Sequence, residues 1–212
     1  MMDHDDDDAA ARPDGSVPLP GALGPDAVPR AAATDLALIG TFAALTAVCS
    51  LVAVPVGPSG APITLQTFAV LLAGAVLGSR RGALAVLLYL AVGFAGLPVF
   101  AQGVGGPATF GKVTIGYLLA FPVAAWLVGL IVERVGRRGW VRTGVIAAAG
   151  VLASLVIYAV GVPVLAARIG VTLGEGIAIN TAFLPFDAVK VACMAVVASS
   201  VHRAFPDLLD RR

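Results

Sequence analysis

Charged side chains are scarce in this chain of 212 residues. Only 13% of the residues are charged, 58% are hydrophobic, and the mean hydropathy is +0.94. Soluble globular domains carry about 25% charged residues, so this composition excludes that class. The formal net charge is +1, and no basic cluster of the kind that binds nucleic acid is present. The sequence therefore predicts an integral membrane protein without a nucleic-acid partner.

Histidine and cysteine are also rare, which limits the chemistry that the chain can perform. His4 lies near the amino terminus and His202 near the carboxyl terminus, and no set of soft ligands has metal-binding spacing. Cys49 and Cys193 both fall within apolar runs, where we expect each thiol to pack as a small apolar group. Without a recognisable nucleophile and base, we expect neither an enzyme nor a metal site.

The hydrophobic residues are gathered into six runs. They cover residues 36–54, 65–78, 82–97, 114–132, 143–167 and 185–201. A helix needs about 20 residues to cross the ~30 Å hydrocarbon core, so the second and third runs are short for full spans. The fold class predicted is an all-α membrane protein with six transmembrane helices in residues 34–205. We expect Asp35 to cap the first helix, an acidic, proline-rich and disordered tail over 1–33, and a short tail over 206–212.

The distribution of cations predicts the orientation in the membrane. With the amino terminus inside, the inner turns and the carboxyl end hold Arg80, Arg81, Arg134, Arg137, Arg138, Arg142, Arg203, Arg211 and Arg212. The outer loops then hold only Lys112 and Arg168. Because cytoplasmic loops carry the excess of Lys and Arg, both termini are predicted to be cytoplasmic in a multi-pass cell-membrane protein. Loops 55–64, 98–112 and 170–184 then lie on the outer face.

Two opposite charges occur at the start of the last run, Asp187 and Lys190. They are three residues apart, so they share one face of a helix. An ionisable group at membrane depth costs roughly 2.5–3.5 kcal/mol or more, which favours a ligand-binding role. The alternative is an interfacial salt bridge in which Lys190 extends its ammonium toward water.

Other polar residues are candidates for the same site. Hydrogen bonds are available from Thr64, Gln66, Tyr89, Thr114, Tyr117 and Asn180, and close backbone approach from Gly105 and Gly106. The alternative is that isolated polar residues only join helices. Residues 106–112 also match most of a nucleotide-binding loop, but Val113 stands where a Ser or Thr must reach magnesium, so we do not expect nucleotide binding.

The ordered motifs of the chain resemble the BioY family, the biotin-binding S components of energy-coupling-factor (ECF) transporters. The resemblance is carried by 62–66 (Pro-Ile-Thr-Leu-Gln), 71–78 (Leu-Leu-Ala-Gly-Ala-Val-Leu-Gly), 96–100 (Gly-Leu-Pro-Val-Phe) and the glycines 105–106. Residues 183–190 are similar to the family's Phe-Leu-Pro-Gly-Asp-x-x-Lys pattern. Two departures from the family patterns border the expected pocket. Where the family has Gly-Pro-Thr-Gly-Gly-Tyr, this chain has Lys112, Val113 and Ile115 in place of the first, second and fourth residues, and Phe186 replaces the glycine before Asp187.

The resemblance implies a prokaryotic membrane subunit that captures biotin from the outer face. Such a subunit binds no cofactor, because ATP is hydrolysed by two cytoplasmic partner subunits attached to a transmembrane coupling subunit. Small residues on the first helix, Ala43 and Ala47, resemble the surface used for that docking. Two alternatives remain open at this point: an S component for another small vitamin-like anion, and a membrane-embedded enzyme that uses Asp187.

Overall fold

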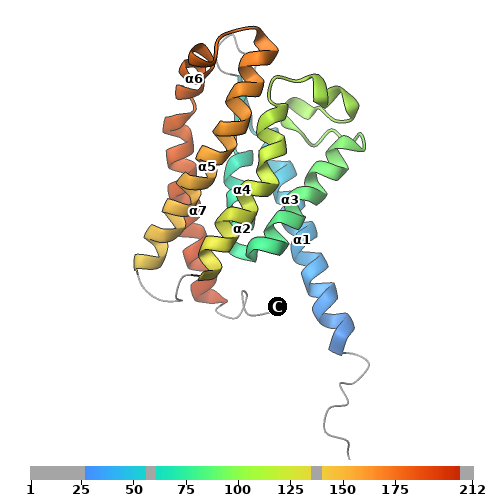
Figure 1. The fold of residues 1–212 in the computed structure, drawn as a ribbon. Helices are drawn as coiled ribbons and strands as arrows, with labels where there is room; N and C mark the ends of the chain where they lie inside the picture. The colour runs from blue at the N-terminus through green and yellow to red at the C-terminus, as the bar shows by residue number, and fades with distance from the viewer. Residues whose placement is uncertain (1–26, 56–60, 135–139, 206–212) are drawn as a thin grey trace, which may run out of the picture.

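The computed structural model is a bundle of helices that run up and down along a common direction (Figure 1). It describes residues 27–55, 61–134 and 140–205. The elements are α1 (Ala27–Leu51), β1 (Ala53–Pro55), β2 (Pro62–Thr64), α2 (Gln66–Leu77), α3 (Ser79–Phe94), η1 (Ala101–Gly103), η2 (Pro107–Gly111), α4 (Ile115–Arg134), α5 (Trp140–Ile169), α6 (Leu173–Thr181) and α7 (Leu184–Ala204). All six predicted apolar runs form helices, as α1 to α5 and α7.

Helix α2 is the centre of the bundle. Ten of its 12 residues are buried, including its first residue, Gln66. A helix that is apolar all round is expected to be surrounded by protein, and α2 packs against α1, α3, α4 and α7. The side chain of Gln66 is therefore placed inside the bundle, where the site described below is built.

Glycines allow the helices to approach closely. A Cβ atom built on Gly74 of α2 would lie 2.1 Å from the carbonyl oxygen of Ala125 in α4. One built on Gly129 of α4 would lie 2.3 Å from the backbone nitrogen of Ser79, at the start of α3. In lipid, helix association depends on packing more than on a hydrophobic driving force, so small residues at these crossings hold the bundle together.

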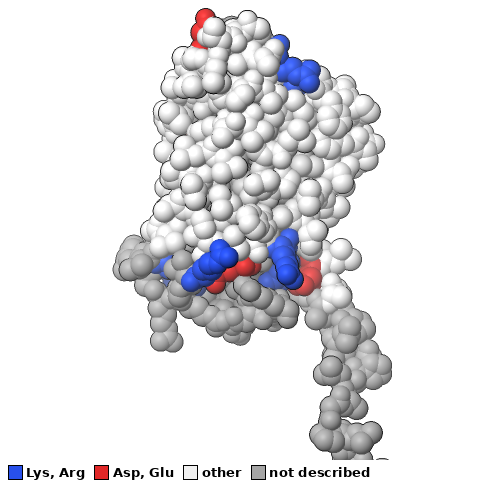
Figure 2. All heavy atoms as spheres, viewed as in Figure 1, with Lys and Arg blue, Asp and Glu red and all other residues white. Residues whose placement is uncertain are grey.

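Charged side chains lie at the two ends of the bundle, and the surface between them is uncharged on the face shown in Figure 2. At one end, Arg81 donates to Asp35 at 3.0 Å, and the carboxylate of Glu133 accepts from the backbone nitrogen of Ser79 at 2.8 Å. In the described part of the chain, α1, α4, α5 and α7 are long and apolar enough to cross a membrane. Helices α2 and α3 are shorter, as the sequence predicts.

The structure corrects two predicted boundaries. Helix α1 begins at Ala27, so residues 27–33 are helical and Asp35 lies inside the helix instead of capping it. The segment 170–184 contains the short helix α6, where we expected a loop. Its start is set by a capping box, in which Thr172 and Glu175 bond each other's backbone nitrogens. The rest of the predicted tails, 1–26 and 206–212, lies outside the described residues.

Two predictions about small side chains are also corrected. Ala43 is buried in the core of the bundle, so it does not lie on the outward docking face that we expected, whereas Ala47 is half-buried against that core and its docking role stays a prediction. Cys49 is buried as predicted, but Cys193 is exposed on the surface of α7. The reason is the same in each case, because the angular position of a residue around its helix depends on where the neighbouring helices lie.

Candidate ligand-binding site

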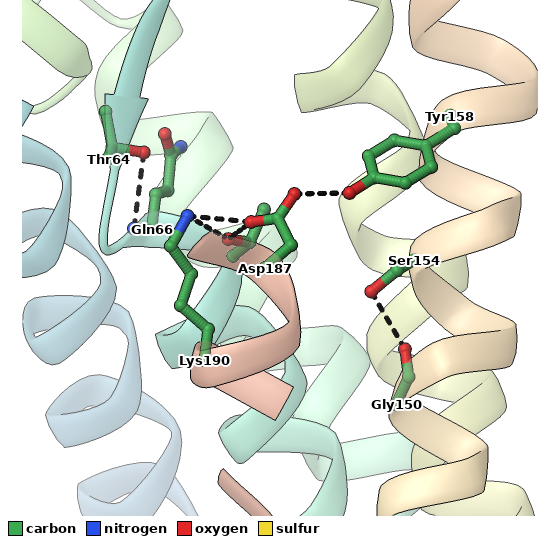
Figure 3. Close-up of polar contacts among 8 residues, drawn as sticks. Thr64, Gln66, Gly150, Ser154, Tyr158, Asp187 and Lys190 are labelled. Atoms are coloured by element: carbon green, nitrogen blue, oxygen red, sulfur yellow. Dashed lines mark hydrogen bonds and ion pairs between the residues drawn. The ribbon is translucent and has the colours of Figure 1, made fainter. Parts of the chain in front are cut away.

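The site is built around the ion pair of Asp187 and Lys190 at the start of α7 (Figure 3). Pro185 occupies the first turn of this helix, where its missing N–H has no intrahelical partner to lose. The Lys190 Nζ atom donates to Asp187 Oδ1 at 2.8 Å, and the two residues are only 8% and 9% exposed. A buried ion pair needs further hydrogen bonds to offset its desolvation.

Thr67 and Tyr158 provide those further hydrogen bonds. Lys190 Nζ donates to Thr67 Oγ1 at 3.2 Å, and Thr67 Oγ1 lies 3.4 Å from Asp187 Oδ1. The hydroxyl of Tyr158, on α5, donates to Asp187 Oδ2. Neither residue was among the candidates from the sequence. Tyr158 could have been found there, because it is an isolated polar side chain within an apolar run.

The ion pair lies in the wall of a cavity near the end of the bundle formed by the β1–β2 hairpin, η1, η2 and α6. The cavity and its open mouth together hold about 590 Å3 of unfilled space. Seven of the predicted site residues line it: Thr64, Gln66, Thr114, Tyr117, Asn180, Asp187 and Lys190. Apolar walls come from Leu118, Phe121, Ile157 and Phe183.

Tyr89 lies behind this cavity instead of lining it. Its ring is 1% exposed, and its hydroxyl lies 2.7 Å from Gln66 Nε2 and donates to the carbonyl oxygen of Val99 at 3.2 Å. The Gln66 amide nitrogen therefore donates to Tyr89, and the amide is held in one orientation. Thr64, at the end of β2, accepts a bond from the backbone nitrogen of Gln66 at 3.3 Å, which joins the hairpin to α2.

Asn180 enters the cavity from α6 and is fixed by Tyr117. The Tyr117 hydroxyl donates to Asn180 Oδ1 at 3.0 Å, and Asn180 is 6% exposed. Because this bond uses the amide oxygen, the two donors of the Asn180 amide nitrogen are the groups directed to other partners.

Gly105 and Gly106 are placed outside the cavity lining. A Cβ on Gly105 would lie 2.1 Å from the carbonyl oxygen of Leu97, and the backbone nitrogen of Gly106 donates to Gly93 at 2.7 Å. These glycines thus let the 98–112 loop fold against the end of α3. Lys112 is exposed and is also absent from the lining.

The arrangement of polar and apolar groups is that of a binding site. Lys190 uses two of its three N–H donors on Asp187 and Thr67 among the described residues, which leaves one for a ligand. The Asp187 carboxylate has lone pairs for N–H donors, and the apolar wall fits a ring or chain. A mostly apolar helical bundle with a charged cavity near one end defines a substrate-binding membrane protein.

Comparison with known sequences identifies the family. Residues 25–207 match the sequence profile of the BioY family. The chain belongs to the BioY family.

Individual relatives agree with this assignment. The chain is 42% identical over 192 residues to the biotin transporter BioY of Rhodobacter capsulatus, covering 84% of this chain and 98% of that one. It is 35% identical over 182 residues to the biotin transporter BioY of Rhizobium etli, covering 84% and 97% of the two chains. Both relatives are named as transporters and not as enzymes.

The fold is shared with a protein of known structure. The crystal structure of the S-component for biotin from an ECF-type ABC transporter superposes with a TM-score of 0.74 at 24% identity. The match covers 82% of this chain and 93% of the other. At this identity the match shows that the two chains share the helical arrangement.

Proposed function

We propose that this chain is the substrate-binding membrane subunit of a biotin uptake system, and that biotin binds in the cavity beside Asp187 and Lys190. The observation that carries the proposal is the buried ion pair, which borders a cavity with both hydrogen-bonding groups and apolar walls. Such a pair is costly in a membrane bundle, and a ligand that bonds to it offsets part of that cost.

The chemistry of biotin complements this cavity. Its ureido ring has two N–H donors, for which the Asp187 carboxylate is an acceptor, and a carbonyl oxygen, for which the remaining Lys190 donor and the Asn180 amide nitrogen are partners. Its thioether ring requires apolar walls, which Phe121, Phe183 and their neighbours supply. Its carboxylate requires a cation, backbone amides or water at the mouth.

The positions of the departures from the family pattern support biotin over another vitamin-like anion. Thr114 and Tyr117, which the pattern retains, line the cavity. Lys112 and Ile115, which break it, do not, and Ile115 is instead buried in the packing of α4. Phe186 is 53% exposed and points to an apolar groove beside the β1–β2 hairpin. The substitutions therefore lie outside the described lining of the cavity.

We propose six membrane spans, with both termini cytoplasmic. Helices α1, α2, α3, α4, α5 and α7 alternate in direction, so the start of α1 and the end of α7 lie at the same end of the bundle (Figure 1). That end carries Arg80, Arg81, Arg134, Arg142 and Arg203, whereas the cavity end carries Lys112 and Arg168. The positive-inside rule then places the cavity at the outer surface of a prokaryotic cell membrane. A reporter protein that is active only in the cytoplasm is therefore expected to be active when it is fused after Arg212.

Uptake against a gradient needs an energy source, which we assign to partner subunits. In this proposal a transmembrane coupling subunit holds the chain, and two cytoplasmic subunits hydrolyse ATP, while the chain itself binds no cofactor. The shared fold with an S-component of an ECF-type ABC transporter supports this assembly. Co-purification of the full chain with the coupling and ATPase subunits encoded in the same genome is the direct check of this assembly.

The first test of the proposed function is equilibrium binding of labelled biotin to the purified full chain in detergent. We expect saturable binding that excess desthiobiotin displaces, because the two compounds share the ureido ring, and that thiamine does not displace. Displacement by thiamine, or no saturable biotin binding by a chain that elutes as a single folded species, would overturn the assignment of biotin as the ligand.

A further inference from the structure

Helix α6 forms part of the cavity wall but is weakly attached to the bundle. Only two of its nine residues, Gly176 and Asn180, are buried, and it packs mainly against α5. Its large apolar residues Leu173 and Ile177 are each 54% exposed. Figure 1 shows α6 at the extreme end of the bundle, between the turns that join it to α5 and α7. Local stability follows the number of buried contacts, so α6 is among the least stable described helices.

The Tyr117–Asn180 hydrogen bond links α6 to α4 on the cavity side. Gly161 of α5 determines where the Tyr117 ring lies, because a Cβ atom at position 161 would come within 2.4 Å of the ring. The ring therefore packs against the backbone of α5 at Gly161, with its hydroxyl 3.0 Å from Asn180 Oδ1. Gly161 does not line the cavity, so its effect on the site passes through Tyr117.

An apolar groove lies on the other side of Asn180. It is formed by α5, α6 and the start of α7, and includes Val162, Leu173, Ile177 and Leu184. Tyr158 and Asn180 line both this groove and the cavity, so these two side chains separate the two spaces. If α6 moves outward with Asn180, the cavity opens into existing free space without disruption of the core.

We propose that Tyr117 and Gly161 are positioning residues that hold α6 against the bundle, and that α6 is a movable wall which retains the ligand. This inference rests on the proposed function for the identity of the ligand, but the attachment of α6 is independent of it. Ligand escapes when the Tyr117–Asn180 bond breaks and α6 moves away. The turn that joins α5 to α6 contains Gly170 at φ +74°, a conformation that glycine adopts without strain.

The test is a double-variant cycle on the rate of biotin dissociation from the full chain. Tyr117→Phe removes the hydroxyl, and Asn180→Leu removes its acceptor at similar volume. One lost hydrogen bond corresponds to a rate increase of about three- to tenfold for Tyr117→Phe, and Asn180→Leu, which also removes the amide donors assigned to the ligand, is expected to give at least this increase. The double variant is expected to be no faster than Asn180→Leu alone, because Asn180→Leu already removes the bond to Tyr117. Gly161→Ala, which displaces the ring, is expected to give the same increase as Tyr117→Phe.

Thr143→Val is the matched control. It removes the hydrogen bond of 2.9 Å between Thr143 of α5 and Ser199 of α7, at the opposite end of the bundle. The dissociation rate of this variant is expected to equal that of the unmodified chain. If the effects of Tyr117→Phe and Asn180→Leu multiply, each side chain contacts the ligand independently and the positioning role is overturned.

A second readout needs no ligand. Val162 is 5% exposed and lies under Gly176 of α6, so a cysteine there reports the position of that helix. In a chain with Cys49→Ala and Cys193→Ala, we expect a water-soluble maleimide to label Val162→Cys several-fold faster when Tyr117→Phe or Asn180→Leu is added, and at an unchanged rate with Thr143→Val. Equal labelling in all variants would overturn the proposal, even if biotin is not the ligand.

Discussion

Removal of one charge from the Asp187–Lys190 pair is predicted to have two separable effects. The first is on stability, because the remaining charge loses its partner while it stays buried. Breaking a buried pair in this way costs roughly 3–5 kcal/mol. The second is on binding, because a ligand hydrogen bond to a charged group contributes roughly 1.5–3 kcal/mol. Lys190→Met, which keeps a side chain of similar length, is therefore expected to weaken biotin binding by about 10- to 150-fold.

The double variant Asp187→Asn with Lys190→Met separates these effects. Both charges are gone, so the cost of an unpaired buried charge disappears, and replacement of a buried pair by neutral groups is often neutral or stabilising. We expect the thermal midpoint in detergent to recover toward that of the unmodified chain, while biotin binding remains weak. Size-exclusion profiles after heating give the midpoint, and labelled biotin gives the affinity.

Lys112→Met provides the matched control. It removes a cation at the same end of the bundle, but this cation is exposed and outside the cavity lining. The affinity of the Lys112→Met variant for biotin is expected to stay within about twofold of that of the unmodified chain, a change of ~0.4 kcal/mol. The reasoning fails if Lys190→Met also stays within twofold, or if the double variant recovers both stability and affinity, because the ion pair would then be structural only.

Three further predictions test other parts of the structure. Gly129→Ala places a methyl group against the backbone of Ser79 and is expected to destabilise the bundle by about 1–3 kcal/mol. Gly144→Ala, whose methyl group meets open space, is the control and is not expected to destabilise it. Thermal midpoints of the two variants give the comparison. Tyr158→Phe removes a donor to the buried carboxylate and is expected to weaken biotin binding about three- to tenfold; an unchanged affinity contradicts this role. The backbone N–H of Thr172 and, to a smaller extent, its hydroxyl lower the pKa of Glu175. This carboxylate therefore stabilises α6 at pH values above its ordinary pKa, and that stabilisation is lost as the pH falls through the lower pKa of the folded state. Glu175→Gln is expected to remove that pH dependence from the labelling of Val162→Cys.

Part of the site was predictable because a charged side chain within an apolar membrane run is costly to bury, so its presence indicates a partner or a ligand. Asp187 and Lys190 stand out in an apolar run, and their spacing of three residues places them on one helix face. The family motifs added Thr64, Gln66, Thr114 and Tyr117, which line the cavity. Residues whose role depends on a partner far away in the sequence were harder to predict. Thr67 and Tyr158 reach the ion pair from α2 and α5, 120 and 29 residues away from Asp187.

The sequence by itself determined the class of this protein, the helical runs and the candidate charged pair, because hydropathy and i,i+3 spacing are local properties that the bilayer selects directly. Only the tertiary structure decided which face of each helix is turned inward. It buried Ala43, exposed Cys193, and placed Tyr89 behind Gln66 instead of in the cavity. It also formed α6 and set Tyr117 against Gly161. Helix rotation and close approach depend on the packing of all neighbouring helices together, and no local pattern contains that information.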